Sequence, residues 1–330
     1  MAEYKGIWIF SEQENGIIAP CVFELLAKAK QLQAHNGEDI TAVLLGSGVS
    51  SLSQELLERG ADQVILCDEP ALAFYSARPY EKALTALSEK YNPSIILYGA
   101  TPIGRDLAPR LMVSLNTGLT ADAIDLGYDE DGVFFQTTPG YGGKILAHIV
   151  ILEARPQMAT VHAGICEPLE KNPGASGKVI IETLGVESDP DYEVLETSEA
   201  KTEGPTLDKA GCIVAGGRGI KTEEDLAMLR ELADFLNGQI ASSRPLVDNG
   251  WLPHDRQIGQ SGTTVKPDLM LNIGVSGSVQ YELGMDKAKC IVAVNPDKNA
   301  PIFDIAHYGV AEDYRKFVPA LIEELKNRKA

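Results

Sequence analysis

Four short runs of apolar residues recur in the first hundred positions of the chain. Each run is continuous instead of alternating, which is typical of parallel strands buried on both faces. The segments between and after them carry apolar residues at helical spacing. The expected strands cover 6–10, 40–45, 63–67 and 94–98, and the expected helices cover 20–37, 50–59, 80–91 and 104–116. This alternation predicts a doubly wound parallel sheet with right-handed crossovers.

The pattern changes after residue 120. Apolar runs at 132–138, 144–154 and 157–164 are separated by Gly and Pro turns, and we expect all three to form an antiparallel addition to the sheet. Residues 187–209 carry eight acids against two lysines and almost no large aliphatic side chains. Such a stretch cannot bury enough apolar area to form a core, so it is interpreted as a linker, with a solvated excursion inside one domain as the alternative.

The strand and helix pattern restarts beyond the acidic stretch. Strands are expected at 212–216, 269–275 and 289–295, and helices at 223–237, 277–284 and 310–327. A length of 330 residues also suits two domains better than one. The fold class is therefore predicted as α/β with two Rossmann-like domains: residues 1–205, a parallel sheet with the antiparallel addition, and residues 206–330, a second doubly wound domain.

Composition narrows the function classes. A net charge of -18 disfavours nucleic acid as a partner, because binding to phosphates depends on Lys and Arg. The five cysteines lie far apart, and no histidine pairs with a second ligand at helical spacing, so no metal site is expected. The first residues lack the features of a secretory signal, and no stretch approaches the roughly 20 apolar residues of a membrane span, so a cytoplasmic protein is expected.

Candidate chemistry is concentrated in loops of the second domain. Small residues fill the expected strand-to-helix junctions at 216–222, 241–244, 259–262 and 274–278. Ligands of such folds bind at the carboxyl ends of the strands, where helix N-termini attract phosphate. Arg218 and Arg244 add guanidinium groups, which suit both phosphate contacts and stacking on planar rings. These junctions predict a site for a planar cofactor that carries phosphate.

Two familiar motifs are absent. None of the Gly-x-Ser-Gly stretches has the Gly-x-Ser-x-Gly form of a nucleophile elbow, which disfavours a hydrolase. The loop GGRGIKT matches neither the dinucleotide fingerprint nor the P-loop. An NAD-dependent dehydrogenase and a non-redox nucleotide-binding module nevertheless stay open as alternatives. The colour of the purified protein would separate them from a flavoprotein, because only the flavoprotein is yellow and bleaches on reduction.

Several motifs in register resemble the alpha subunit of the electron transfer flavoproteins. They are TPIGRDLAPRL and TGLTAD in the first half, and AGGRG, ASSRP, QIGQSG, GVSGSVQYELGM and VNPDKNAPIFDIAHYG in the second. The resemblance runs along essentially the whole chain. It implies that residues 1–205 pack against a smaller beta subunit in a heterodimer and that residues 206–330 bind FAD.

The same resemblance implies an electron carrier with no small-molecule catalysis of its own. It would pass electrons between acyl-CoA dehydrogenase-type flavoproteins or NADH and a quinone- or ferredoxin-linked acceptor. Electron bifurcation stays open, as does the choice between AMP and a second FAD in the beta subunit.

The resemblance also implies which residues line the FAD groove. Arg244 would lie against the isoalloxazine and raise its potential, and Ser261 would place its hydroxyl near N5. Ser276 and Ser278 would meet phosphate or the N1/C2 end of the ring. The full set is Arg218, Ser243, Arg244, Ile258, Gly259, Gln260, Ser261, Ser276, Gly277, Ser278, Val279, Gln280, Tyr281, Asn295 and Asp313, with Asn295 and Asp313 at the adenosine end.

One position departs from the family pattern. The chain has GSVQY where many members have GAIQH, so Tyr281 replaces the histidine expected to approach the flavin C2 carbonyl. A phenol can donate a hydrogen bond, but with a pKa of about 10 it carries no positive charge at neutral pH. Stabilisation of the anionic reduced flavin would then depend more heavily on Arg244.

Overall fold

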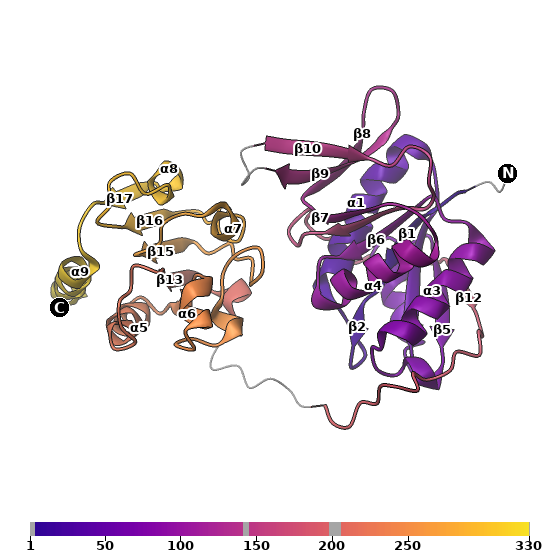
Figure 1. The fold of residues 1–330 in the computed structure, drawn as a ribbon, viewed down its shortest axis with the longest axis horizontal. Coiled ribbons are helices and arrows are strands. Elements are labelled where there is room, and N and C mark those ends of the chain that lie inside the picture. The colour runs from indigo at the N-terminus through magenta and orange to yellow at the C-terminus, as the bar shows by residue number, and fades with distance from the viewer. Residues whose placement is uncertain (1–3, 141–144, 198–205, 330) are drawn as a thin grey trace. The chain divides into compact units, whose positions relative to one another are not determined.

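The computed structural model describes residues 4–140, 145–197 and 206–329. It divides the chain into two compact units, Met1–Thr197 and Ser198–Ala330 (Figure 1). Both units consist of a parallel sheet with helices, as the sequence predicts. No helix in the described part of the chain is long and apolar enough to cross a lipid bilayer.

The first unit is built on seven parallel strands in the order β12-β5-β4-β1-β6-β11-β7. The four strands expected in the first hundred residues are present as β1, β4, β5 and β6. The strands are β1 (Ile7–Phe10), β4 (Ile40–Gly46), β5 (Gln63–Asp68), β6 (Ile95–Gly99), β7 (Leu119–Ala123), β11 (Gln157–Val161) and β12 (Lys178–Ile181).

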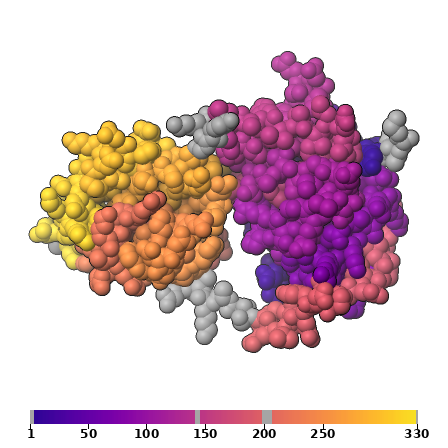
Figure 2. Space-filling model, in the orientation of Figure 1, coloured from indigo at the N-terminus to yellow at the C-terminus, as the bar shows by residue number. Residues whose placement is uncertain are grey.

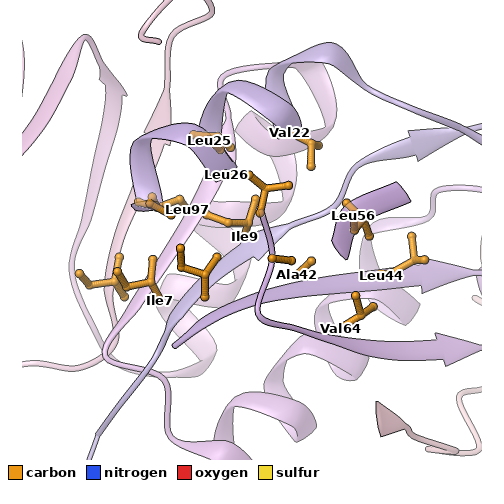
Figure 3. Close-up of a cluster of buried hydrophobic side chains, with 14 of the residues drawn as sticks. Ile7, Ile9, Val22, Leu25, Leu26, Ala42, Leu44, Leu56, Val64 and Leu97 are labelled. Carbon is orange, nitrogen blue, oxygen red and sulfur yellow. The ribbon is translucent and has the colours of Figure 1, made fainter. Parts of the chain in front are cut away.

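Helices cover both faces of this sheet because successive residues of a strand point to opposite faces. Ile7 and Ile9 of β1 pack in one apolar cluster with the helix α1 (Pro20–Asn36), as Figure 3 shows, and this cluster also contains α2 (Leu52–Glu58). Trp8 and Phe10 of the same strand pack in a second cluster with the helices of the other face. These are α3 (Ala77–Tyr91) and α4 (Pro102–Ser114), and the short helix η1 (Pro70–Leu72) adjoins them.

The antiparallel addition contains only two of the three runs expected there. It is the sheet β10-β9-β8, formed by β8 (Asp125–Tyr128), β9 (Phe134–Gly140) and β10 (Ile145–Val150), and its β8–β9 turn projects from the surface (Figures 1 and 2). The expectation for the third run was wrong. Strand β11 lies inside the main sheet, parallel to β6 and β7. All five of its residues are buried, and a strand buried on both faces is stable only between covered neighbours.

The chain after β12 is fastened to the first unit. The Glu69 carboxylate accepts hydrogen bonds from the backbone N–H groups of Leu184, Gly185 and Val186, at 2.5, 3.2 and 2.7 Å. The first part of the acidic segment is held by Arg78, whose guanidinium forms ion pairs with two aspartates, Asp189 and Asp191. At the other end of the segment, Leu207 is 2% exposed in a core cluster of the second unit. The two ends of the acidic segment therefore belong to different units.

The second unit is built on five parallel strands in the order β14-β13-β15-β16-β17. Helices α5, α6 and α9 pack in one apolar cluster, and α7 and α8 pack in the cluster on the opposite face. The chain changes faces between the neighbouring strands β13 and β15, which is where ligands of doubly wound sheets bind.

The elements of the second unit agree in type with those expected from the sequence, and several short ones are additional. The strands are β13 (Cys212–Gly216), β14 (Gln239–Ser242), β15 (Leu269–Ile273), β16 (Ile291–Val294) and β17 (Tyr308–Val310). The helices are η3 (Leu207–Lys209), α5 (Asp225–Phe235), α6 (Arg244–Asp248), η4 (His254–Arg256), α7 (Val279–Glu282), α8 (Ile302–Ile305) and α9 (Tyr314–Lys329). The first unit also contains the hairpin of β2 (Gln13–Glu14) and β3 (Ile17–Ile18).

Candidate functional site

The carboxyl edge of the five-stranded sheet carries the loops that the sequence predicts to be functional. Arg218 follows β13, Arg244 follows β14, Ser276 follows β15, Asn295 follows β16 and Asp313 follows β17. Neighbouring strands lie about 4.8 Å apart, so five strands give an edge of roughly 20 Å. The predicted residues are thus distributed along one extended rim.

Two glycine loops meet at the point where the chain changes faces. Gly217 N–H donates to Ile273 O at 2.9 Å, and Gly219 N–H donates to Gly274 O at 2.9 Å. A Cβ atom on Gly217 would lie only 2.4 Å from Gly274 O, and one on Gly219 would lie 2.7 Å from Gly274 Cα. The two loops can pack this closely only because neither has a side chain there.

The GQSG segment 258–262 forms backbone hydrogen bonds with two neighbours, the end of β14 and the helix α7. Ile258 N–H donates to Ser242 O at 2.9 Å, which ties the segment 258–262 to the end of β14. Gln260 N–H donates to Gln280 O in α7 at 2.7 Å. Backbone hydrogen bonds therefore connect the GQSG loop both to the edge strand and to the loop that follows β15.

The outer part of the rim is held by groups that the sequence interpretation assigned to a ligand. Asn295 Nδ2 donates to Val275 O at 2.8 Å, and Asn295 Oδ1 accepts from Asp297 N–H at 2.9 Å. Asp313 Oδ1 accepts from Arg315 N–H at 2.8 Å. The side chains of Asn295 and Asp313 thus support the local backbone in this structure.

Two guanidinium groups stand at the rim. Arg218 is exposed and forms no ion pair with the residues that the structure describes. The side chain of Arg244 is 68% exposed, and its Nε lies 3.3 Å from Asp248 Oδ2, one helical turn along α6. An ion pair this exposed contributes little stability, so the Arg244 side chain can change partner at small cost.

Exposed hydroxyls and amides lie between these charges. Ser276 and Ser278 are both exposed, and the N–H groups of 276–278 have no acceptor among the described residues. Ser261 Oγ accepts a hydrogen bond of 2.9 Å from Nε2 of Gln257, a buried residue. A hydroxyl has one proton and two acceptor positions, so Ser261 keeps its own proton for another acceptor.

Tyr281 is buried, and its hydroxyl has a protein partner. Its side chain is 3% exposed, and its hydroxyl donates to Oδ1 of Asn272 in β15 at 2.6 Å. Burial raises the pKa of the phenol, so it stays protonated. The structure therefore directs this hydroxyl into the core of the unit.

Sequence reasoning missed a polar cluster beneath the first glycine loop. Asp225 at the start of α5 accepts hydrogen bonds from the Tyr314 hydroxyl at 2.7 Å and from Arg315 Nη2 at 2.8 Å. The Tyr314 hydroxyl in turn accepts from Lys221 N–H at 3.3 Å. The Arg315 guanidinium and, less strongly, the Tyr314 hydroxyl lower the pKa of Asp225 from 3.8 to about 2. The Asp225 acid is 89 residues from Tyr314, so no local pattern predicts the contact.

The sequence also did not identify Asn272 and Gln257, which are the hydrogen-bond partners of Tyr281 and Ser261. Asn272 interrupts the apolar run LMLNIGV, and this interruption was the available signal.

Comparison with known protein families gives two matches. Residues 7–188 match the family described as the electron transfer flavoprotein domain. Residues 206–286 match the family described as the electron transfer flavoprotein FAD-binding domain.

Curated relatives match this chain over 97% or more of its length. An electron transfer flavoprotein subunit alpha of Thermoanaerobacterium thermosaccharolyticum is 43% identical, with 100% of each chain covered. One of Megasphaera elsdenii is 40% identical, covering 100% of this chain and 98% of the relative. The lactate dehydrogenase (NAD(+),ferredoxin) subunit LctC of Acetobacterium woodii is 39% identical, and the match covers 97% of this chain and 76% of the relative.

Proposed function

This chain belongs to the electron transfer flavoprotein family, and we propose that it holds FAD along the carboxyl edge of its five-stranded sheet. It is an electron carrier of the alpha-subunit type with an FAD-binding domain. The observation that carries the assignment of the site is the position of the matched FAD-binding region. Residues 206–286 contain both glycine loops, both guanidinium groups and the exposed serines of the rim.

The rim suits the polar groups of FAD. Arg218 has no protein counter-ion in the described structure and can neutralise phosphate, assisted by the free N–H groups of 276–278. Ser276 and Ser278 supply hydroxyl donors. The groove is proposed to be lined by Arg218, Ser243, Arg244, Ile258, Gly259, Gln260, Ser261, Ser276, Gly277, Ser278, Val279, Gln280, Tyr281, Asn295 and Asp313. Within this set, the contacts of Asn295 and Asp313 support a structural contribution to the rim, and the buried Tyr281, whose hydroxyl donates to Asn272, supports a structural contribution from the core.

Bound FAD supplies the isoalloxazine ring that accepts and releases the electrons. The protein contributes orientation and charge. Gln257 holds Ser261 Oγ from beneath and leaves the Ser261 proton free to point into the groove. Arg244, whose one ion pair among the described residues is the exposed contact with Asp248, supplies a mobile positive charge for the negative charge that reduction creates. The proposed role requires no general acid, base or nucleophile, so we infer a carrier without small-molecule catalysis of its own.

We infer further that the chain works as a heterodimer with a beta subunit. The antiparallel sheet of the first unit supports this inference. Its edge strand β10 pairs only with β9 among the described strands and exposes large apolar side chains, with Ile145 54% and Leu146 60% exposed. Exposed apolar residues on an open strand edge are typical of a surface covered by another chain.

The proposed donors are acyl-CoA dehydrogenase-type flavoproteins or NADH, and the proposed acceptors are linked to quinone or ferredoxin. The similarity to a subunit of an NAD- and ferredoxin-dependent lactate dehydrogenase supports electron bifurcation as a second candidate. Co-expression with the beta subunit, a flavin count and a test of reduction by NADH distinguish the two. One FAD without NADH reactivity indicates a simple shuttle, and two with NADH reactivity indicate bifurcation. A colourless heterodimer that binds no FAD would reject the proposed function.

A further inference from the structure

Asn272 is a polar side chain in an apolar core. It lies in the central strand β15 and is 0% exposed. Alternation along the strand directs it to the same face as Met270, which packs with Ile258, Val275 and other apolar residues. A buried carboxamide is costly unless its oxygen and nitrogen find partners. Its position in the centre of the sheet therefore requires an explanation.

Tyr281 supplies the close partner. Its hydroxyl lies 2.6 Å from Asn272 Oδ1, whereas Asn272 Nδ2 reaches Val292 O at the longer distance of 3.4 Å. A phenol has one proton, so a hydroxyl that donates to Asn272 cannot donate to a ligand at the same time. The pair connects α7 to the sheet through a single buried hydrogen bond.

The helix α7 in turn supports the GQSG loop. Gln280 O accepts from Gln260 N–H at 2.7 Å, and Gly284 O accepts from Val265 N–H at 2.8 Å. A Cβ atom on Gly284 would lie 2.4 Å from Gly259 N, so the two backbones are in direct contact. Because α7 has only four residues, it has little internal cooperativity to hold its position. Its attachment to Asn272 thus helps to fix the position of the GQSG loop, together with the hydrogen bond from Ile258 N–H to Ser242 O at the end of β14.

We propose that Tyr281 is a positioning residue for FAD, acting through Asn272, and that its hydroxyl makes no contact with the flavin. The hydrogen bond between them holds α7 against β15 and thereby sets the position of Gln260 and Ser261 in the groove. This inference rests on the proposed function, because it assumes that FAD binds at the same rim. It replaces the expectation that Tyr281 approaches the C2 carbonyl.

A double-mutant cycle on the full chain with its beta subunit tests the proposal. Tyr281→Phe leaves a buried amide oxygen without a donor, and Asn272→Leu leaves a buried hydroxyl without an acceptor. Each single variant is expected to raise the FAD dissociation constant about tenfold. Tyr281→Phe/Asn272→Leu removes the same hydrogen bond only once, so its dissociation constant is expected to lie within about threefold of that of either single variant and not to rise about a hundredfold.

The flavin spectrum and potential provide a readout specific to the site. Tyr281→Phe and Asn272→Leu are expected to give the same spectrum and the same potential as each other, because both act through one hydrogen bond and neither residue contacts the ring. Tyr308→Phe, at a tyrosine that is 66% exposed, is the matched control and is expected to change neither quantity.

Two results would overturn the proposal. One is a shift of the potential in Tyr281→Phe that is absent from Asn272→Leu, which would show that the phenol acts on the flavin directly. The other is unchanged FAD affinity in Tyr281→Phe. Failure of the proposed function is distinguishable from both, because the unsubstituted heterodimer would then bind no FAD at all.

Discussion

The two units have the same kind of sheet edge but fill it differently. In the first unit, the chain changes faces between β1 and β6, and protein groups form hydrogen bonds with one another there. Thr101 Oγ1 donates to Glu12 Oε2 at 2.5 Å and accepts from Gly104 N–H at the start of α4. In the second unit, glycines meet at the equivalent point, and Arg218 and Ser276 stay exposed beside them.

The difference shows how one architecture can have a structural or a binding edge. At the first edge, the Glu12 carboxylate and the capping Thr101 accept the hydrogen bonds of the available donors. The negative charge of the carboxylate also repels phosphate. Glycine backbones and unpaired guanidinium or hydroxyl groups leave the second edge able to accept it. A few side chains at the strand ends therefore distinguish the edge of the proposed site from the edge of the first unit.

The largest expected effect on stability and flavin binding is that of a substitution at Gly217, where the two glycine loops of the second unit meet. In Gly217→Val, the new Cβ would lie 2.4 Å from Gly274 O and 2.5 Å from Val275 Cα, both backbone atoms. We expect the unfolding free energy of this unit to fall by about 3 kcal/mol and the bound flavin to be lost. Urea unfolding and the flavin-to-protein ratio measure both. Gly211→Ala is the control, because its nearest neighbour is 3.7 Å away, and full flavin content in Gly217→Val would contradict the close packing.

Asp225→Asn probes the cluster beneath the same edge. The folded pKa of Asp225 lies below its ordinary value of 3.8, so its stabilising contribution is present above about pH 4 and is lost as the pH falls toward 2. Because the Arg315 side chain is 48% exposed, we expect a loss of only about 1 kcal/mol at pH 7. Chemical unfolding between pH 2 and 7 measures it, with the exposed Glu223→Gln as control. A difference that does not shrink at low pH would exclude the charge as the cause.

Arg244→Ala tests the charge proposed to face the flavin. Loss of a partly solvated cation is worth about 1 kcal/mol, which lowers a one-electron potential by roughly 40 mV. A redox titration of the heterodimer measures the shift, and the fold is expected to stay intact. Arg230→Ala removes the same charge from an exposed position on α5 and should leave the potential unchanged. Equal potentials for Arg244→Ala and the unsubstituted protein would reject the role of Arg244.

Glu12→Gln should have the smallest effect on the free energy of unfolding, and it should stabilise the protein instead of destabilising it. Burial raises the pKa of Glu12 above its ordinary value of 4.5, so the folded state favours the protonated acid and loses this advantage as the pH rises through the folded pKa. A neutral amide avoids that loss, and we expect Glu12→Gln to stabilise the first unit by about 0.5 kcal/mol at pH 7. Thermal unfolding at pH 4.5 and 7 measures the difference, and the exposed Glu89→Gln is the control. Destabilisation at pH 7 would show that the ionised carboxylate is needed there.

Local patterns in the sequence predicted most of the elements and the loops that meet at one edge of the second sheet. Continuous apolar runs identified β1, β4, β5 and β6, because burial on both faces imposes the same residue types on any such strand. Gly, Ser and Arg at the strand ends identified the loops that the structure brings to one edge. Both signals are contained within a few neighbouring residues, so one sequence is enough to detect them.

Contacts between distant residues were beyond these patterns. The residues of β11 were assigned to the wrong sheet, because the partners β6 and β7 are chosen by packing along the whole unit. The direction of the Tyr281 hydroxyl likewise depends on Asn272, and the pKa of Asp225 depends on Arg315. Periodicity and turn chemistry are thus encoded in adjacent positions, whereas strand pairing, buried polar pairs and charge partners arise only when the folded chain brings remote residues into contact.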